Sequence, residues 1–230
     1  STSSGSGLME AAVKSLILKK GVFFSLGAFG KRWYEMAIAN GKEADIYEVE
    51  EGYSNKAEFI DSILKKGCYD FAAITHNETS TGVENPLIDI SNVMKKYSDI
   101  IFAVDTVSST GGVDIDVDSC KIDFCVTSTQ KCLGLPPGLS ICNISDKAIN
   151  RTKYVENRGY YLDLLTLYEY TINKDYQYPA TPSLSHMYAL DYKLNKIINI
   201  EKKENRFNRQ CTGSRNYFKN KSMFNERDLR

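Results

Sequence analysis

Residues 100–110 read Ile-Ile-Phe-Ala-Val-Asp-Thr-Val-Ser-Ser-Thr, and this stretch decides the fold. Its five leading apolar residues predict a strand that is buried on both faces, as strands are in a parallel sheet. Asp105 ends the strand, and hydroxyl side chains follow it. Two other expected strands end similarly: His-Asn-Glu-Thr-Ser-Thr-Gly follows Phe71–Thr75, and Ser-Thr-Gln-Lys follows Phe124–Thr127. Ligands of such sheets bind beyond the carboxyl ends of the strands, so we expect a site where these polar stretches meet.

Strands and helices alternate along most of the chain. Asn55 and Glu58 have the spacing of a capping box at a helix start. Pro86 is placed as the first residue of another helix. Repeated strand–helix–strand units predict an α/β domain, a mostly parallel sheet sandwiched by helices. The expected strands are 22–26, 46–49, 71–75, 100–105, 124–127 and 139–144, and the expected helices are 8–20, 31–40, 55–66, 86–97 and 183–220.

The domain organisation follows from the same pattern. We expect residues 1–190 to form one large domain and residues 191–230 to continue a long helix into an incomplete, smaller C-terminal domain. The sequence opens in a glycine-rich turn without an initiator Met. We therefore expect the natural chain to begin earlier.

Composition excludes several classes of protein. Of the 230 residues, 29 are basic and 29 acidic, so no excess charge favours nucleic acid or an anionic membrane surface. No apolar run is long enough for a membrane span, and no signal-peptide pattern is present; we expect a cytoplasmic protein. The six cysteines form no CxxC pair and no metal-ligand cluster with the two histidines, which predicts buried, reduced thiols and no metal site.

Lys131 is the first candidate for chemistry. Most lysines are solvated surface groups, but Lys131 follows a strand through Ser-Thr-Gln and precedes a loop that contains Pro136 and Pro137. A lysine held at a strand end among polar groups can be partly desolvated, which favours the neutral amine that forms a Schiff base with a carbonyl cofactor.

Asp105 and the opening turn are the other two candidates. A carboxylate directly after five apolar residues needs a partner, either a structural one or a cofactor nitrogen. The Gly-Ser-Gly turn at residues 5–7 opens a helix and can bind a phosphate with its backbone amides. A dinucleotide fingerprint requires a third glycine, and Glu10 and Ala11 occupy that region instead.

Six sequence blocks carry a resemblance to a known family: SGSGLMEA, GAFGKRW, THNETSTGVENPL, VDTVSSTGG, STQKCLGLPPGLS and YPATPSLSHMYAL. From Ser4 to about Arg209 the chain resembles the class V aminotransferases, in particular their alanine–glyoxylate and serine–pyruvate branch. The resemblance implies a fold type I large domain, pyridoxal 5'-phosphate as cofactor, and a homodimer with shared active sites.

The resemblance also implies a role for each matching residue. Lys131 matches the Schiff-base lysine, which also moves the proton from the substrate Cα to the cofactor, and Asp105 matches the partner of the pyridine nitrogen. Phe29 and Val107 match residues on the two faces of the ring. The remaining matches are Ser6, Gly7, the amide of Leu8 and Gln130 at the phosphate, Thr79 near the phenolic oxygen, and Tyr178 with Thr181 at the phosphate of the neighbouring subunit. His76 and Glu78 lie on the same loop as Thr79, and contact with ligand is left open for both.

The resemblance implies a transaminase that moves the amino group of a small amino acid, of alanine or serine type, to a 2-oxo acid such as glyoxylate or pyruvate. The arginine that grips the substrate carboxylate in this family falls beyond Arg230, so its role is transferred to no residue here. We expect a chain limited to these residues to bind the cofactor and to turn over amino acids poorly.

Four alternatives remain. A cysteine desulfurase needs a mobile nucleophilic cysteine, whereas the cysteines here lie on or beside expected strands. A 2-aminoethylphosphonate transaminase fits the same residues. A nucleotide-binding Rossmann oxidoreductase would rest on the glycine-rich turn alone, and the last alternative is a fragment that folds and dimerises without turnover.

Overall fold

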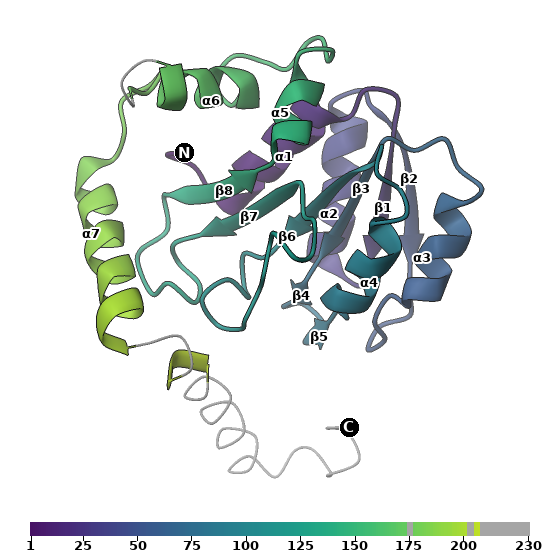
Figure 1. Ribbon diagram of the computed structural model, residues 1–230, viewed down its shortest axis with the longest axis horizontal. Helices are drawn as coiled ribbons and strands as arrows, with labels where there is room; N and C mark the ends of the chain where they lie inside the picture. The colour runs from purple at the N-terminus through teal and green to yellow at the C-terminus, as the bar shows by residue number, and fades with distance from the viewer. Residues whose placement is uncertain (174–176, 202–204, 208–230) are drawn as a thin grey trace.

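A computed structural model of the chain describes residues 1–173, 177–201 and 205–207. Within these residues, six strands form one sheet in the order β2-β1-β3-β6-β7-β8 (Figure 1). The first five strands in that order are parallel, and β8 is antiparallel to β7. The expected α/β architecture with a mostly parallel sheet is therefore confirmed.

The strands of this sheet are β1 Lys20–Ser25, β2 Glu43–Glu48, β3 Phe71–Thr75, β6 Ile101–Asp105, β7 Phe124–Ser128 and β8 Ser140–Ile144; β4 Asn77–Glu78 and β5 Val83–Glu84 form a small hairpin. The helices are α1 Gly5–Leu16, α2 Ala28–Ala39, α3 Ala57–Leu64, α4 Leu87–Met94, α5 Asp146–Thr152, α6 Leu164–Asn173 and α7 Leu184–Asn195, followed by the π-helix η1 Lys196–Glu201.

Helices cover both faces of the sheet because alternate strand residues point to opposite sides. In β1, Phe23 packs into a core with α1 and α2, whereas Val22 and Phe24 pack into a second core with α3 and α4. Residues Phe71–Thr75 and Ile101–Asp105 are buried throughout. The continuous apolar runs that predicted these strands thus reflect burial on two faces.

The capping box expected at Asn55 and Glu58 is wrong. The residue before α3 is Lys56, and no side chain caps this helix. Asn55 is buried instead: its amide N–H donates to Asn85 Oδ1 at 2.9 Å, and its side chain donates to the carbonyl of Phe24 at 3.4 Å. A tertiary contact with a neighbouring loop therefore outcompetes the local cap.

Other element boundaries also differ from expectation. The helix expected from Lys31 begins at Ala28, and the helix expected to reach Tyr97 ends at Met94. The sequence pattern did not indicate α6. The long C-terminal helix is observed as α7 followed by η1, with no buried residue in either, and the boundary expected after residue 190 falls inside α7. Most of residues 202–220, over which the helix was expected to continue, lie outside the described residues.

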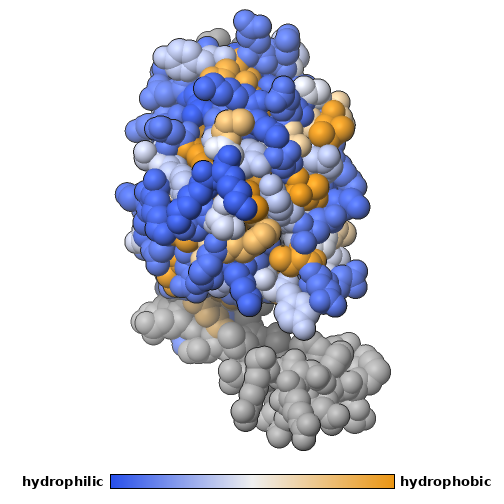
Figure 2. Space-filling view, turned by 90° about the vertical axis from the view of Figure 1, so that its right-hand side faces the viewer, coloured by the Kyte–Doolittle hydropathy of each residue, from blue (hydrophilic) through white to orange (hydrophobic). Residues whose placement is uncertain are grey.

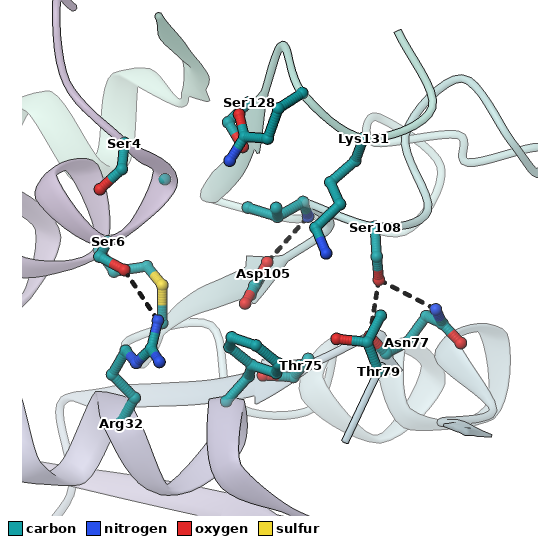
Figure 3. A pocket seen from close by; sticks show the side chains of 15 residues that line it. Ser4, Ser6, Arg32, Thr75, Asn77, Thr79, Asp105, Ser108, Ser128 and Lys131 are labelled. Carbon is teal, nitrogen blue, oxygen red and sulfur yellow. Dashed lines mark hydrogen bonds between the residues drawn. The ribbon is translucent and has the colours of Figure 1, made fainter. Parts of the chain in front are cut away.

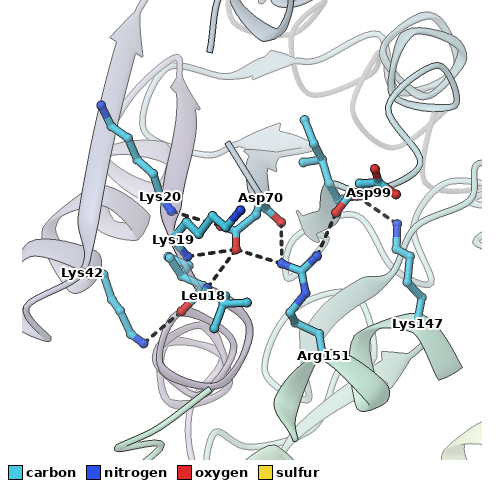
Figure 4. A network of polar contacts seen from close by, with 10 residues as sticks. Leu18, Lys19, Lys20, Lys42, Asp70, Asp99, Lys147 and Arg151 are labelled. Carbon is cyan, nitrogen blue, oxygen red and sulfur yellow. Dashed lines mark hydrogen bonds and ion pairs between the residues drawn. The ribbon is translucent and has the colours of Figure 1, made fainter. Parts of the chain in front are cut away.

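A polar network ties the amino-terminal ends of the strands together (Figure 4). The Asp70 carboxylate accepts hydrogen bonds from the backbone amides of residues 18–20, at 2.9 to 3.1 Å. Arg151 of α5 donates to Asp70 Oδ2 at 2.9 Å and to the carbonyl of Asp99 at 2.8 Å. Lys147 donates to the carbonyls of Ser98 and Ile100. These bonds fasten α1, α5 and the starts of β1, β3 and β6 at one edge.

The β2 edge of the sheet is polar, with acidic residues at both ends of β2. Figure 2 shows that the molecular face at this edge is mostly hydrophilic with isolated apolar side chains. Charged edge strands resist pairing with other chains. Across the described residues, no helix has the length and apolarity that a membrane crossing would require.

Thiols are distributed differently from expectation. Cys120 and Cys125 are buried, Cys132 and Cys142 are partly buried, and all four are free. Cys68 is free and exposed, so the expectation that the cysteines are buried is wrong at this position. Cys211 lies outside the described residues.

Candidate active site

A cavity of about 320 Å³ lies beyond the carboxyl ends of β3, β6 and β7 (Figure 3). The helix starts of α1 and α2 complete its wall. A cavity therefore lies at the edge of the sheet where the site was expected. The structure brings seven of the residues named from the sequence to its lining: Ser6, Phe29, Thr79, Asp105, Val107, Gln130 and Lys131.

Alternation along the chain after β3 decides which side chains reach the cavity. Thr75, Asn77 and Thr79 line it, whereas His76 and Glu78 do not. Side chains of extended backbone point to opposite sides with a period of two residues. Applied to residues 75–79, that period would have identified Thr75 and Asn77 from the sequence.

His76 and Glu78 have structural partners instead of a place in the lining. His76 is 3% exposed; its Nδ1 lies 3.0 Å from Ser109 Oγ and its Nε2 3.4 Å from a Glu84 carboxylate oxygen. Glu78 is fully buried, and its Oε2 accepts the backbone amides of Phe29 at 3.0 Å and Gly30 at 2.9 Å. Glu78 thus caps the start of α2.

Asp105 is a buried carboxylate with few partners. It is 4% exposed, and its Oδ1 accepts the backbone amide of Val107 at 2.8 Å. Burial raises the pKa of Asp105 to about 6, the Val107 amide opposes this rise, and the negative charge of Glu78 adds to it. The positive charges of Arg32 and Lys131 lower the same pKa by smaller amounts. A cationic ligand group beside Asp105 would restore its ionised form.

Lys131 points into the cavity from the loop after β7 (Figure 3). Its ammonium group has no hydrogen-bond or ion-pair partner among the described residues. Beside Lys131 the lining contains Ser108 (Figure 3), whose hydroxyl donates to the carbonyl of Asn77 at 2.8 Å and accepts from the Asn77 side chain at 2.9 Å. This reciprocal pair joins the segments that follow β3 and β6. Since the Lys131 amine has no such partner in the described part of the chain, it is available to a ligand.

The start of α1 forms the end of the cavity away from Lys131, at Ser4, Gly5 and Ser6. A Cβ on Gly5 would lie 2.6 Å from Val107 Cγ2, so only glycine allows the helix to approach the wall this closely. Unpaired amides at a helix start attract anions.

Gly7 and Leu8, which were also expected at the phosphate, do not line the cavity. The Gly7 amide donates to the carbonyl of Ser4 at 2.9 Å, and the Leu8 side chain is buried in the core at 1% exposure. The structure places the first residues of the turn, not the later ones, in the lining.

α2 supplies an aromatic ring and a cation to the cavity. Phe29 and Arg32 are one helical turn apart, and the guanidinium carbon of Arg32 lies 4.7 Å from the centre of the Phe29 ring. Arg32 Nη1 also donates to Ser6 Oγ at 3.1 Å. Arg32 was not identified from the sequence, because no motif distinguishes it from the adjacent exposed Lys31.

Several buried polar atoms in the lining have no partner. The hydroxyls of Thr75 and Ser128 are 2% and 0% exposed by residue, and neither makes a hydrogen bond; Gln130 Oε1 is also unpaired. Buried polar groups without a partner are costly in native proteins. These atoms therefore indicate that the cavity is built for a polar ligand.

Tyr178 and Thr181 lie outside this cavity, in the segment between α6 and α7. Both are exposed to solvent. The cavity of this chain is formed without them. Gly5, part of the expected Gly-Ser-Gly turn, does line the cavity. Besides Arg32, Thr75 and Asn77, the sequence interpretation did not assign a role to Ser4, Met9, Ser108 or Ser128.

Comparisons with known proteins agree with this arrangement. The chain is 40% identical over 221 residues to an uncharacterized aminotransferase of Methanocaldococcus jannaschii, covering 93% of this chain and 57% of that protein. It is 30% identical over 202 residues to a 2-aminoethylphosphonate–pyruvate transaminase of Bacillus cereus, covering 86% and 54%. The chain thus spans about half of these curated relatives.

A solved structure supports the fold. The crystal structure of alanine–glyoxylate aminotransferase from Nostoc sp. matches with a TM-score of 0.87 at 27% identity, covering 95% of this chain and 58% of that one. The fold type I large domain expected from the resemblance is confirmed. Residues 26–213 match the sequence profile described as aminotransferase class-V, which is most of the chain, and the chain therefore belongs to the class V aminotransferase family.

Proposed function

We propose that this chain is the cofactor-binding part of a pyridoxal-phosphate-dependent transaminase. The observation that carries the proposal is the cavity in which Lys131, Asp105 and the start of α1 meet. A nucleotide-binding Rossmann oxidoreductase does not need an amine, a buried carboxylate and an anion-binding end around one small cavity, whereas enzymes that use this cofactor do. The Rossmann alternative has no use for Lys131.

The residues present fit pyridoxal 5'-phosphate. The unpaired Ser128 hydroxyl and the amides at the start of α1 suit a phosphate, and Asp105 suits a protonated pyridine nitrogen. Phe29 and Val107 both line the cavity and are suited to the two faces of an aromatic ring. When bound, this cofactor supplies an electron sink for the carbanion formed at the substrate Cα.

The chain's own residues would divide the work as follows. Lys131 holds the cofactor covalently through its amine and later carries the proton at the substrate Cα. Asp105 holds the proton at the ring nitrogen. Thr79 would position the ring and Gln130 the phosphate, and both residues line the cavity.

We extend the proposal to substrates and assembly. A small amino acid, of alanine or serine type, would be the donor and glyoxylate or pyruvate the acceptor, in a cytoplasmic homodimer. Tyr178 and Thr181 would reach the phosphate in the partner subunit, which accounts for their exposure here. The similarity to a protein named 2-aminoethylphosphonate–pyruvate transaminase keeps that phosphonate as a second candidate donor.

The proposal is tested by trapping the cofactor. The purified protein is incubated with pyridoxal phosphate, treated with borohydride, digested and mapped by mass spectrometry. We expect the pyridoxyl label on Lys131 and its loss in Lys131→Ala, with Lys31→Ala as a control that keeps the label. Label on another lysine, or none at all, would contradict the assignment.

A donor panel separates the two candidate substrates. Alanine, serine and 2-aminoethylphosphonate are assayed against glyoxylate and pyruvate with the natural full-length protein. We expect the amino acids to react and the phosphonate to be inert. Turnover of the phosphonate alone would favour the second candidate.

A further inference from the structure

Arg32 joins three parts of the cavity. It projects from α2, packs its guanidinium 4.7 Å from the Phe29 ring centre, and donates to Ser6 Oγ in the first turn of α1 at 3.1 Å. Figure 3 shows the guanidinium directed at Ser6, at the end of the cavity away from Lys131. Arg32 therefore belongs to the anion-binding end and at the same time backs the ring that faces the ligand.

The bond to Ser6 determines what the Ser6 hydroxyl can do. A guanidinium only donates hydrogen bonds, so Ser6 Oγ is the acceptor in this pair. The hydroxyl hydrogen of Ser6 remains free, since the described residues offer it no acceptor. Ser6 lines the cavity, so this hydrogen is available to an acceptor atom of a ligand.

Within the described part of the chain, Arg32 also lacks a direct ion pair, although its positive charge lowers the pKa of Asp105 in the same cavity. One bond to Ser6 engages only one of its five N–H donors. The lining contains one other cation, Lys131, whose amine is needed for covalent attachment in the proposed function. The lining contains one carboxylate, which belongs to the buried Asp105.

We infer that Arg32 is a specificity-determining residue that makes the site prefer the phosphorylated cofactor over its unphosphorylated form. It supplies positive charge to the phosphate dianion and holds Ser6 as a hydrogen-bond donor towards it. The inference rests on the proposed function. According to this inference, α2 contributes to phosphate recognition together with the start of α1.

Pyridoxamine 5'-phosphate and pyridoxamine test the inference, because they differ only in the phosphate and neither bonds covalently to Lys131. Their dissociation constants are measured by fluorescence titration of the full 230-residue chain freed of cofactor. The readout is the ratio of the two constants. We expect Arg32→Gln to reduce this ratio roughly tenfold to a hundredfold, as loss of a hydrogen bond to a charged group implies.

Further variants separate charge, hydroxyl and folding. Arg32→Lys should keep part of the ratio, and Ser6→Ala should lower it without changing pyridoxamine affinity. In the double variant Ser6→Ala/Arg32→Gln, the combined loss should be smaller than the product of the single losses, because the two residues act together. Lys31→Gln, an exposed cation on the same helix, is the matched control and should leave the ratio unchanged.

Three results would overturn the inference. Arg32→Gln could retain the wild-type ratio, or it could weaken both amines equally, which would make Arg32 a support for the ring only. Arg32→Gln could also fail to fold. In that case the inference would be overturned if Ser6→Ala and Arg32→Lys both kept the wild-type ratio of the two dissociation constants. A wild-type chain that binds neither amine would refute the proposed function and this inference with it.

Discussion

Two buried carboxylates behave differently at the residue scale because their partners differ. Glu78 accepts two backbone amides through Oε2, and its Oε1 accepts the amide and hydroxyl of Ser80. Asp105 accepts one amide, from Val107, and faces the cavity. Burial without enough donors raises the pKa of Asp105 to about 6. Asp105 is thus the carboxylate that remains available to a ligand.

The raised pKa of Asp105 predicts a pH-dependent stability of the cofactor-free protein. A carboxyl with a pKa of about 6 when folded, above its ordinary 3.8, stabilises the fold below pH 3.8 and loses that contribution as pH rises through 6. Asp105→Asn should therefore raise the free energy of unfolding at pH 7 by up to about 3 kcal/mol and change it little at pH 3.5. Urea denaturation at both pH values measures this.

Binding of the cofactor should offset the greater stability that Asp105→Asn has at pH 7 without it. With pyridoxal phosphate bound, wild-type protein should gain more thermal stability than Asp105→Asn, since only the carboxylate pairs with a protonated ring nitrogen. Equal stability of the two cofactor-free proteins at pH 7 would show that Asp105 is already compensated.

Phe29 gives a second prediction at the residue scale. If its ring stacks on the cofactor, Phe29→Ala should weaken cofactor binding about tenfold, whereas Phe29→Tyr should largely preserve it. The affinity ratio between the phosphorylated and unphosphorylated amines should stay constant, unlike in Arg32→Gln. Equal affinity in all three proteins would leave Phe29 as an ordinary packing residue.

At the scale of elements, the start of α2 is held by a residue about fifty positions away. Gly27 precedes the helix and has no side chain to cap it, so Glu78 from β4 accepts the amides of Phe29 and Gly30. A Cβ at Gly27 would lie 2.6 Å from Glu78 Cγ, so glycine is needed for the carboxylate to approach. The cap fixes the helix that bears both Phe29 and Arg32.

Removing the cap should loosen both fold and site. Glu78→Gln keeps one acceptor oxygen but turns the other into a donor facing donors, which should cost about 2–3 kcal/mol of folding free energy. Denaturation and cofactor titration should both show the loss. Glu58→Gln, in the first turn of α3 on the surface, is the matched control and should change neither.

At the scale of the whole molecule, the polar network that stabilises the fold and the cavity lie at opposite edges of the sheet. The Asp70–Arg151 network is at the amino ends of the strands, and the cavity is beyond their carboxyl ends. A strand of five residues spans about 15 Å. The sheet therefore separates the group that fastens the helices from the group that binds ligand.

This separation predicts that the two properties can be changed independently. Arg151→Met should lower the free energy of unfolding by about 1–3 kcal/mol, because it leaves Asp70 with backbone donors alone. The cofactor dissociation constant of the folded variant should match that of the wild type. A large change in that constant would mean that the network transmits strain to the cavity.

Local pattern was sufficient where a single segment contains the signal. Continuous apolar runs identify β3, β6 and β7, and the polar residues that follow them identify Asp105, Gln130 and Lys131. The carboxyl ends of parallel strands meet at one edge whatever the rest of the chain does. The period of two along residues 75–79 is likewise a local signal, and it identifies Thr75 and Asn77.

The sequence by itself determined the α/β class, the family resemblance and the residues at strand ends, because periodicity and motifs are properties of neighbouring residues. Only the tertiary structure decided that Glu78 caps α2 instead of reaching the ligand, and that Arg32 meets Ser6. It also decided that Asn55 turns inward to Asn85 and leaves α3 uncapped. Each of these contacts joins residues 26 to 49 positions apart, and such pairings follow from the packing of whole elements against the sheet.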